Sequence, residues 1–190
     1  MRILIVESSL KPLSENSNTR TLCKVAKRAL LTAGAEKVVV RSLKGMEYDF
    51  NTKLTADDGS EDQMTQLLKT VLKADAVILA TPIWWGLHSS LAQSFIERLD
   101  EFDNWATKKK INPMAEKAFA SIVSGGGDGF QHIHGLHCAF ASFLGFTVPP
   151  KSMLECKLQT PKEIMTDRKL AEETAVWAKN LVRCVNQLQQ

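Results

Sequence analysis

The sequence predicts one α/β domain over residues 1–190, with a doubly wound parallel sheet and helices on both faces. Five short apolar runs alternate along the chain with segments in which apolar residues recur at helical spacing, and this alternation is typical of a parallel sheet covered by helices. Three loops of unusual composition follow the first, third and fourth of these runs. Ligands of doubly wound proteins bind beyond the carboxyl ends of the strands, so the same fold predicts one site where the three loops meet.

The individual elements follow from local patterns. Strands are predicted at residues 3–6, 38–40, 74–80, 118–123 and 145–148, and prolines stop the third and the fifth because proline cannot donate to the ladder. Helices are predicted at residues 18–33, 61–73, around 91–102, around 136–144, and from 160 onward as one last helix. Thr160, Pro161 and Glu163 form a capping box with proline in the first turn. With right-handed crossovers, this order of elements predicts the flavodoxin-like strand order 2-1-3-4-5.

Composition restricts the class of protein further. The formal net charge is +3, from 24 Lys and Arg against 21 Asp and Glu, which is too balanced to indicate nucleic-acid binding. The first apolar run is far too short for a signal peptide or a membrane span. The 4 cysteines are scattered without a C-x-x-C pair, as in reduced thiols of a cytoplasmic protein. We therefore expect a cytoplasmic protein with no membrane span and no nucleic-acid partner.

The loop after the third strand carries the most informative motif, Thr81-Pro82-Ile83-Trp84-Trp85-Gly86. Proline ends the strand, and two adjacent indoles then stand in a loop, where packing in the core is least expected. Glycine suits a place where the backbone approaches a flat ligand or needs a positive φ. We interpret Pro82, Ile83, Trp84, Trp85 and Gly86 as one wall of a site for a planar ring system. The alternative is a surface loop that folds its tryptophans back onto the core.

The loop after the first strand is rich in hydroxyl and amide side chains and leads directly into a helix. Free backbone N–H groups and the positive end of the helix dipole make such a place an anion site. The loop contains neither G-x-G-x-x-G nor G-K-[ST], so a monoester phosphate fits it better than a dinucleotide or a Walker A ligand. Helix capping alone would use the same geometry. The predicted cofactor-binding residues in this loop are Ser8, Ser17, Asn18 and Thr19.

The loop after the fourth strand contains a cluster of glycines between Ser124 and Phe130. Such a loop lets the backbone wrap closely around a ligand, and its peptide groups can hydrogen-bond the polar rim of a heterocycle. A flexible turn would have the same composition. The predicted cofactor-binding residues here are Ser124, Gly125, Gly126, Gly127 and Asp128.

These loops resemble the NAD(P)H-dependent FMN reductase and quinone reductase branch of the flavodoxin-like superfamily, to which the iron–sulfur flavoproteins are related. In that branch a serine follows the first strand, G/S-N-T starts the first helix, and the third loop is close to S-P-V-Y-W-G. The fourth loop is glycine-rich, and a segment similar to L-G-F-x-V-P-P follows it. The matching residues are Ser8, Ser17–Thr19, Thr81–Gly86, Ser124–Gly129 and Leu144–Pro150. The resemblance implies FMN as cofactor, NAD(P)H as co-substrate, and homodimers or homotetramers with active sites near subunit boundaries.

Three features depart from the pattern of that family. Glu7 and Leu10 stand in the loop where the family frequently has the glycine and arginine of G-S-x-R. The contacts of this loop with a phosphate are therefore expected to differ from those of the family. Trp84 replaces the usual tyrosine, so a flat surface is kept and a phenol donor is lost. No cysteine lies between Cys23 and Cys138, so we do not expect the iron–sulfur cluster of the related branch.

The resemblance implies an FMN-dependent oxidoreductase that takes hydride from NAD(P)H and reduces a small acceptor such as a quinone or free flavin. No second nucleotide-binding motif is visible, which agrees with sequential use of one site, and spacing singles out no catalytic side chain. One alternative is a flavodoxin-type electron carrier. Carriers of that kind are acidic, whereas this chain has a pI of about 8.7. The other alternative is a cofactor-less interaction domain of the same fold.

Features outside the three loops have less specific interpretations. The segment 43–63 is either a lid over the flavin or a solvated excursion. Phe102 and Trp105 extend a helix beyond what one core needs, so we expect exposed aromatics there and at least a homodimer. The basic run Lys108–Lys110 is predicted to be a solvated loop.

Three histidines lie close together at His132, His134 and His137. His134 and His137 share a helix face, but His132 points elsewhere, and no carboxylate at matching spacing completes a set of metal ligands. We therefore expect no metal site and a partly exposed start of a helix.

Overall fold

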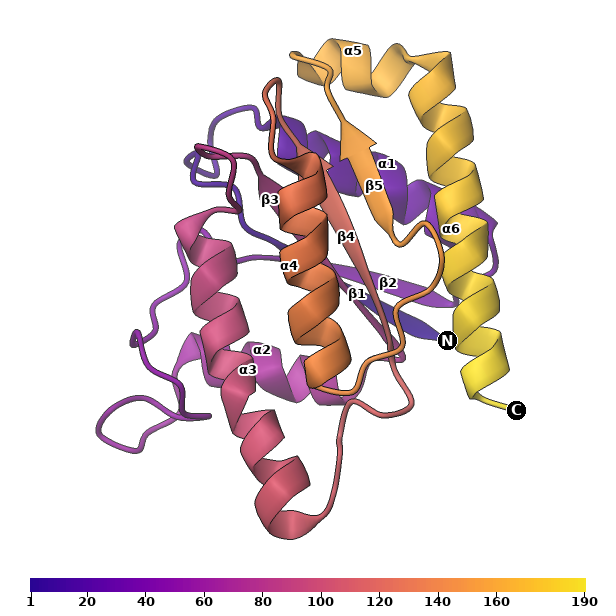
Figure 1. Ribbon diagram of the computed structural model, residues 1–190. Coiled ribbons are helices and arrows are strands. Elements are labelled where there is room, and N and C mark those ends of the chain that lie inside the picture. Colours follow the sequence, from indigo (N-terminus) through magenta and orange to yellow (C-terminus); the bar gives the residue numbers. More distant parts are fainter.

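The computed structural model describes residues 1–190 and contains a five-stranded sheet whose neighbouring strands are all parallel (Figure 1). The strand order is β2-β1-β3-β4-β5, so the predicted flavodoxin-like fold is confirmed. β1, β3 and β4 are buried along almost their whole length because helices cover both faces of the sheet. The strands are β1 (Arg2–Glu7), β2 (Lys37–Ser42), β3 (Ala76–Pro82), β4 (Ala118–Ser124) and β5 (Met153–Cys156).

The helices form two layers, one on each face of the sheet, and each layer has its own apolar core. Side chains of α1, α5 and α6 pack on one face, and side chains of α2, α3 and α4 pack on the other. None of these helices combines the length and the apolar composition that crossing a membrane requires. The helices are α1 (Asn18–Thr32), α2 (Gln63–Leu72), α3 (Ser90–Lys109), α4 (Phe130–Phe143), α5 (Pro161–Thr166) and α6 (Arg168–Leu188).

Capping side chains start several of these helices. The hydroxyls of Ser17 and Ser89 each accept a backbone N–H three residues further on, at the starts of α1 and α3. Thr160 and Glu163 form the predicted capping box at α5. The single last helix was a wrong prediction, because Asp167 has an extended backbone that ends α5, and its carboxylate caps α6.

The fifth strand also differs from the prediction. The run 145–148 is not a strand, and its only ladder contact is a bridge between Thr147 and Ala118 at the start of β4. The chain pairs with β4 as a parallel strand only after the two prolines, beginning where Met153 pairs with Ser121. The run 145–148 is apolar because it closes the core beneath α4, where Phe146 is buried, and not because it belongs to the sheet.

The segment between β2 and α2 contains no helix or strand, and a buried ion pair ties its far end to α3. Arg98 is fully buried and donates to both carboxylate oxygens of Asp62 at 2.8 and 3.0 Å and to the carbonyl oxygen of Asp49 at 3.0 Å. Burial by itself raises the pKa of Asp62, but hydrogen bonds from Arg98, Thr65 and Asp49 outweigh it and lower the pKa to about 2. One carboxylate therefore anchors this segment and also starts α2.

The helix α3 buries more of its aromatic side chains than the sequence suggests. Phe102 lies in the core of the chain itself, so the prediction that it is exposed is wrong. Trp105 is half-buried, packs edge-on against Phe102 at 5.5 Å, and is covered by the Lys109 ammonium 4.3 Å from its ring centroid. Phe102 therefore does not supply the exposed aromatic surface expected of it, whereas Trp105 is partly exposed.

Candidate functional site

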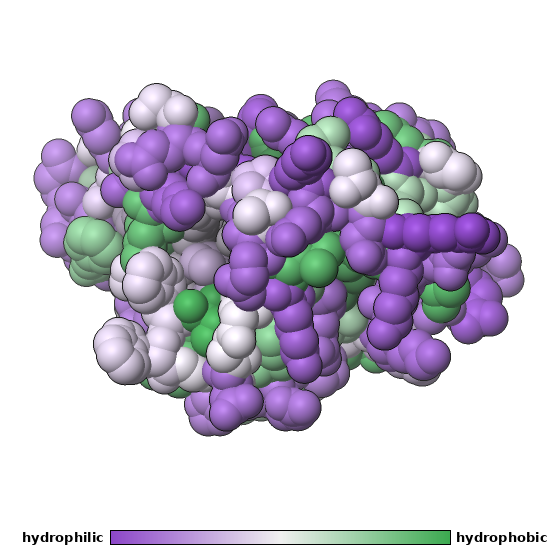
Figure 2. Space-filling model, turned by 90° about the horizontal axis from the view of Figure 1, so that it is seen from above, coloured by the Kyte–Doolittle hydropathy of each residue, from purple (hydrophilic) through white to green (hydrophobic).

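A pocket of about 160 Å³ opens at the carboxyl ends of β1, β3 and β4, where the three predicted loops meet. Seen from above, this edge of the molecule is hollowed between mostly hydrophilic side chains, with small hydrophobic patches beside the hollow (Figure 2). Residues predicted from all three loops line the pocket: Ser17, Asn18, Thr19, Pro82, Ile83, Trp84, Ser124 and Gly125.

Within the first loop, Ser9 and not Ser8 faces the pocket, together with Leu10 and Lys11. Ser8 is fully buried, donates to the carbonyl oxygen of Ala80 at 2.8 Å, and accepts from the Ser89 hydroxyl at 3.0 Å. It therefore joins β1, β3 and the start of α3 beneath the pocket. Sequence reasoning missed Ser9, Leu10 and Lys11, although Lys11 is the one cation between the first strand and the first helix.

The wall formed by the start of α1 is rich in hydrogen-bond donors. The backbone N–H groups of Asn18 and Thr19 have no acceptor within the helix, because they belong to its first turn. Ser17 donates its hydroxyl proton to Ser9 Oγ at 2.9 Å, and Thr19 Oγ1 lies 2.7 Å from Ser124 Oγ, which joins this wall to the end of β4. Hydroxyls, two free amides and the Lys11 ammonium group together form a site suited to an anion.

A partly exposed arginine shapes the first loop. Arg20 on α1 donates to the carbonyl oxygens of Lys11, Pro12 and Glu15 at 3.1, 2.6 and 2.7 Å. Glu7, which stands where the resembling family often has glycine, is fully buried and accepts from the N–H of Ser9 at 2.8 Å. Burial raises the pKa of Glu7, and its hydrogen bonds and the nearby Arg20 partly offset that rise. Both ionic side chains thus hold the backbone of the loop in place through hydrogen bonds.

The second wall of the pocket is a tight hairpin after β3. Trp84 and Leu87 exchange backbone hydrogen bonds at 2.8 and 2.9 Å, and the two residues between them have positive φ, 51° at Trp85 and 80° at Gly86. This is the pattern of a two-residue turn with left-handed central residues. Trp84 is 49% exposed and lines the pocket, whereas Trp85 is 98% exposed at the tip and does not. The two tryptophans therefore occupy different environments.

The glycine-rich loop packs against that hairpin, backbone on backbone. A Cβ at Gly129 would lie 2.8 Å from the Cα and the carbonyl oxygen of Gly86, and a Cβ at Gly125 would lie 2.9 Å from Ile83 Cβ. A Cβ at Gly126 would lie 2.6 Å from Gln159 Nε2. Three of these glycines therefore permit close approach between loops. Gly86 itself has open space beside its α-carbon, so its positive φ is what requires glycine there.

Three of the predicted residues lie outside the pocket on the exposed rim of the glycine-rich loop, namely Gly126, Gly127 and Asp128.

Asn18 ties the opposite side of the pocket to the segment after β5, because its side-chain amide donates to the carbonyl oxygen of Gln159 at 2.9 Å. No residue of the segment 43–62 lines the pocket.

The prediction that the histidines lie at a partly exposed helix start is wrong for His137. His137 is fully buried, its Nδ1 lies 2.8 Å from Ser121 Oγ, and its ring stacks on His88 at 5.3 Å between centroids. Burial lowers the pKa of His137 to about 3, with smaller effects of His88 and His134. No three His, Cys, Asp or Glu side chains are arranged to hold a metal ion. The pair therefore packs the base of the hairpin against α4.

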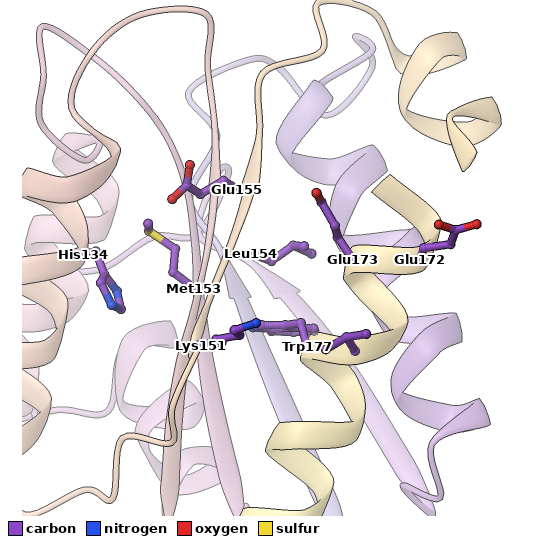
Figure 3. A pocket seen from close by; sticks show the side chains of 9 residues that line it. His134, Lys151, Met153, Leu154, Glu155, Glu172, Glu173 and Trp177 are labelled. Atoms are coloured by element: carbon purple, nitrogen blue, oxygen red, sulfur yellow. The ribbon is translucent and has the colours of Figure 1, made fainter. Parts of the chain in front are cut away.

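A larger hollow of about 590 Å³ lies elsewhere, along the open edge of β5 between α4 and α6 (Figure 3). Its floor is apolar around Met153 and Trp177, and the Trp177 indole donates to the carbonyl oxygen of Ser152 at 3.0 Å. Glu172 and Glu173 at its rim pair with basic residues one turn earlier on α6. None of the residues predicted to bind a cofactor lines this hollow, so volume alone does not locate the functional site.

A protein-family match covers the part of the chain that forms the pocket at the carboxyl edge of the sheet. The model of the NADPH-dependent FMN reductase family matches residues 1–157, which include every residue that lines that pocket. The chain belongs to this family. The FMN reductase region thus ends just after β5, and α5 and α6 follow it.

Comparison with individual proteins gives the same fold. The 8-demethyl-8-aminoriboflavin-5'-phosphate synthase of Streptomyces davaonensis is 28% identical over 160 residues, which cover 80% of this chain and 62% of that protein. The chain spans less than two thirds of the length of the curated relatives that it matches. RosB with bound 8-demethyl-8-formylriboflavin-5'-phosphate has a TM-score of 0.82 at 21% identity, over 100% of this chain and 80% of that one. A flavone reductase has a TM-score of 0.73 at 16% identity, over 100% and 65%.

Proposed function

We propose that this member of the FMN reductase family binds FMN, takes hydride from NADH or NADPH, and reduces a small acceptor such as a quinone or a free flavin. One observation carries the proposal: an anion site at the start of α1 and a half-exposed indole, Trp84, line the same pocket. A phosphate monoester attached to a planar ring system matches both features. The family supports a flavin-dependent oxidoreductase.

The donor set of the pocket fits the phosphate of FMN. The free N–H groups of Asn18 and Thr19 and the hydroxyl of Ser9 would donate to the phosphate oxygens, and Lys11 would balance their charge. Ser17 would orient the Ser9 hydroxyl, because it donates its own proton to Ser9 Oγ. Glu7, which departs from the resembling family's pattern, leaves this donor set intact because it is buried. Leu10 lines the pocket and supplies no donor in place of the arginine that the resembling family frequently has there.

The isoalloxazine ring would lie at the mouth of the pocket. The pocket has a volume of about 160 Å³, which is smaller than the roughly 300–1,000 Å³ usual for sites that bury a whole ligand. Trp84 and Ile83 would flank the ring, and the backbone of the glycine-rich loop would meet its polar rim. Bound FMN supplies the hydride acceptance and onward electron transfer of this reaction. The side chains bind and orient it and exclude water from one face.

Two further properties complete the proposal. We propose a cytoplasmic protein, because its four cysteines, Cys23, Cys138, Cys156 and Cys184, are all free. We also propose a homodimer or homotetramer, as the family resemblance implies. A small-molecule acceptor is the proposed partner in the reaction.

A second candidate function treats the flavin phosphate as a substrate. It is favoured by the relative named as a synthase of a modified riboflavin phosphate, and by the TM-score of 0.82 with a structure that holds such a compound. The same pocket would then bind FMN for modification of its ring.

Anaerobic stopped-flow absorbance separates these possibilities. FMN-loaded protein mixed with NADH or NADPH should lose its flavin absorbance without a second protein, and a quinone should restore it. A flavin that only a separate reductase protein can reduce would support the electron-carrier alternative and overturn the proposal. Mass analysis of the released flavin tests the second candidate, because a modified ring would change its mass. Protein that fails to quench FMN fluorescence would support the cofactor-less alternative.

A further inference from the structure

The strand β5 lies at the edge of the sheet, and its outer side is open. Only β4 lies beside it, and the two strands are parallel. The carbonyl oxygens of Ser152 and Cys156 accept hydrogen bonds from backbone N–H groups on the β4 side. Because alternate residues of a strand direct their backbone groups to opposite sides, the N–H and C=O groups of Met153 and Glu155 point away from β4. The outer side of β5 therefore offers donors and acceptors that no second strand meets.

The hollow of about 590 Å³ lies along this outer side, between α4 and α6 (Figure 3). A strand added beside β5 would therefore lie between the two helix layers, as the other strands of the sheet do. Figure 3 shows Met153 and Glu155 on the α4 side of β5 and Leu154 on the α6 side. Val176 of α6 lines the hollow and is 51% exposed, so an apolar side chain of an added strand would cover it. A second hollow of about 340 Å³ shares Glu155 and Glu173 with the first, so the groove continues past the end of β5.

The charged side chains along this edge have opposite signs at its two ends. Lys151 lies just before β5, is exposed, and takes part in none of the ion pairs of the chain. Glu155, near the other end of the strand, is also exposed and unpaired, and Glu173 lines the same groove. Lys151 and Glu155 are four residues apart, which is about 13 Å along an extended strand. The edge thus has a basic end, an acidic end and the apolar side chain of Met153 between them.

We infer that this edge binds an extended segment of a partner protein, which adds to the sheet as a strand antiparallel to β5. The segment has a basic, an apolar and an acidic residue at alternate positions, and these meet Glu155, Met153 and Lys151 in that order. The antiparallel direction is chosen because its hydrogen bonds are slightly more stable per residue than those of a parallel pair. Main-chain hydrogen bonds to Met153 and Glu155 give affinity, and the alternate side chains give specificity. None of these residues lines the pocket at the carboxyl ends of β1, β3 and β4, so the inference is independent of the proposed function.

A dye-labelled pentapeptide with blocked ends, Lys-Thr-Leu-Val-Glu, is the probe for this surface. In fluorescence anisotropy titrations it should bind saturably, with one peptide per chain. The reversed peptide, Glu-Val-Leu-Thr-Lys, has the same composition and charge but would place its acidic end at Glu155, so its Kd should be about 10-fold higher. N-methylation of the central leucine removes the hydrogen bond to Met153 and should also raise the Kd about 10-fold. N-methylation of the valine should change the Kd little, because that N–H points away from β5.

Charge reversal on the protein tests the register of the added strand. Glu155→Lys should raise the Kd of the probe about 10-fold, because it turns an attractive surface contact into a repulsive one. A peptide whose first residue is glutamate in place of lysine should restore binding to this variant. Glu116→Lys, at an exposed position two residues before β4, is the matched control and should leave the Kd unchanged. Circular dichroism checks that both variants keep the wild-type fold.

Several results would overturn the inference. These are no saturable binding, equal binding of the reversed peptide, no effect of leucine N-methylation, and a Glu155→Lys variant that binds the probe normally or is not rescued by the altered peptide. Light scattering tests a second copy of the chain as the occupant. A change in the mass of the assembly in Glu155→Lys would place a second copy on this edge, and the inference of a partner segment would be wrong.

Discussion

Gly129→Ala should separate the two loops that form the mouth of the pocket. Gly129 has φ 129° and caps α4, a backbone conformation that costs other residues about 1–3 kcal/mol. The added methyl would also lie 2.8 Å from two backbone atoms of Gly86, which cannot move aside as a flexible side chain can. Overpacking of this kind costs about 1–3 kcal/mol more. The lower ends of the two ranges together give about 2 kcal/mol.

Two measurements check this value. Urea unfolding of the FMN-free protein should show a free energy of unfolding lower by about 2 kcal/mol or more. Fluorescence titration should show a Kd for FMN raised about 30-fold, since the hairpin that carries Trp84 must move away from the glycine-rich loop. The unfolding measurement does not depend on the identity of the ligand.

Gly127→Ala is the matched control in the same loop. Gly127 is exposed and has nothing within 4 Å of its added Cβ, so alanine there should be neutral or stabilise by up to about 1 kcal/mol. Wild-type stability in Gly129→Ala would refute the argument from close packing. Equal impairment of both variants would instead show that loop flexibility matters, and not the contact with Gly86.

Three other predictions concern the buried ion pair, the buried histidine and the two tryptophans of the hairpin. Asp62→Asn leaves the buried Arg98 guanidinium without its counter-charge and should lower the free energy of unfolding by about 3–5 kcal/mol in urea titrations. Because burial lowers the pKa of His137 to about 3, the unfolded chain binds a proton below about pH 6.5 that the folded chain does not. Stability should therefore fall by about 2 kcal/mol between pH 7 and 5, and His137→Phe should abolish that part of the fall. Trp84→Ala should weaken FMN binding in fluorescence titrations, whereas Trp85→Ala should leave it unchanged; equal effects would show that both indoles contact the ring.

Much of the site is predictable from the sequence because loop composition is a local property. Proline, glycine and hydroxyl residues mark the ends of β1, β3 and β4, and the strand order brings those ends to one edge of the sheet. The choice between neighbouring residues is not predictable in this way. Ser8 and Ser9 are equivalent by composition, yet only Ser9 faces the pocket, because Ser8 bonds to Ala80 and Ser89 more than 70 residues away.

By itself, the sequence determined the alternation of strands and helices, the order of the sheet, the capping of α1 and α5, and the three loops at its carboxyl edge. These follow from short continuous apolar runs, from apolar residues at the helical spacing of 3.6 residues, and from the conformational preferences of glycine, proline and serine. Only the tertiary structure decided that β5 begins after the prolines, that Gly129 meets Gly86, and that His137 is buried against His88. Each of these depends on contacts between segments distant in the chain, and local patterns carry no information about such contacts until the segments are packed together.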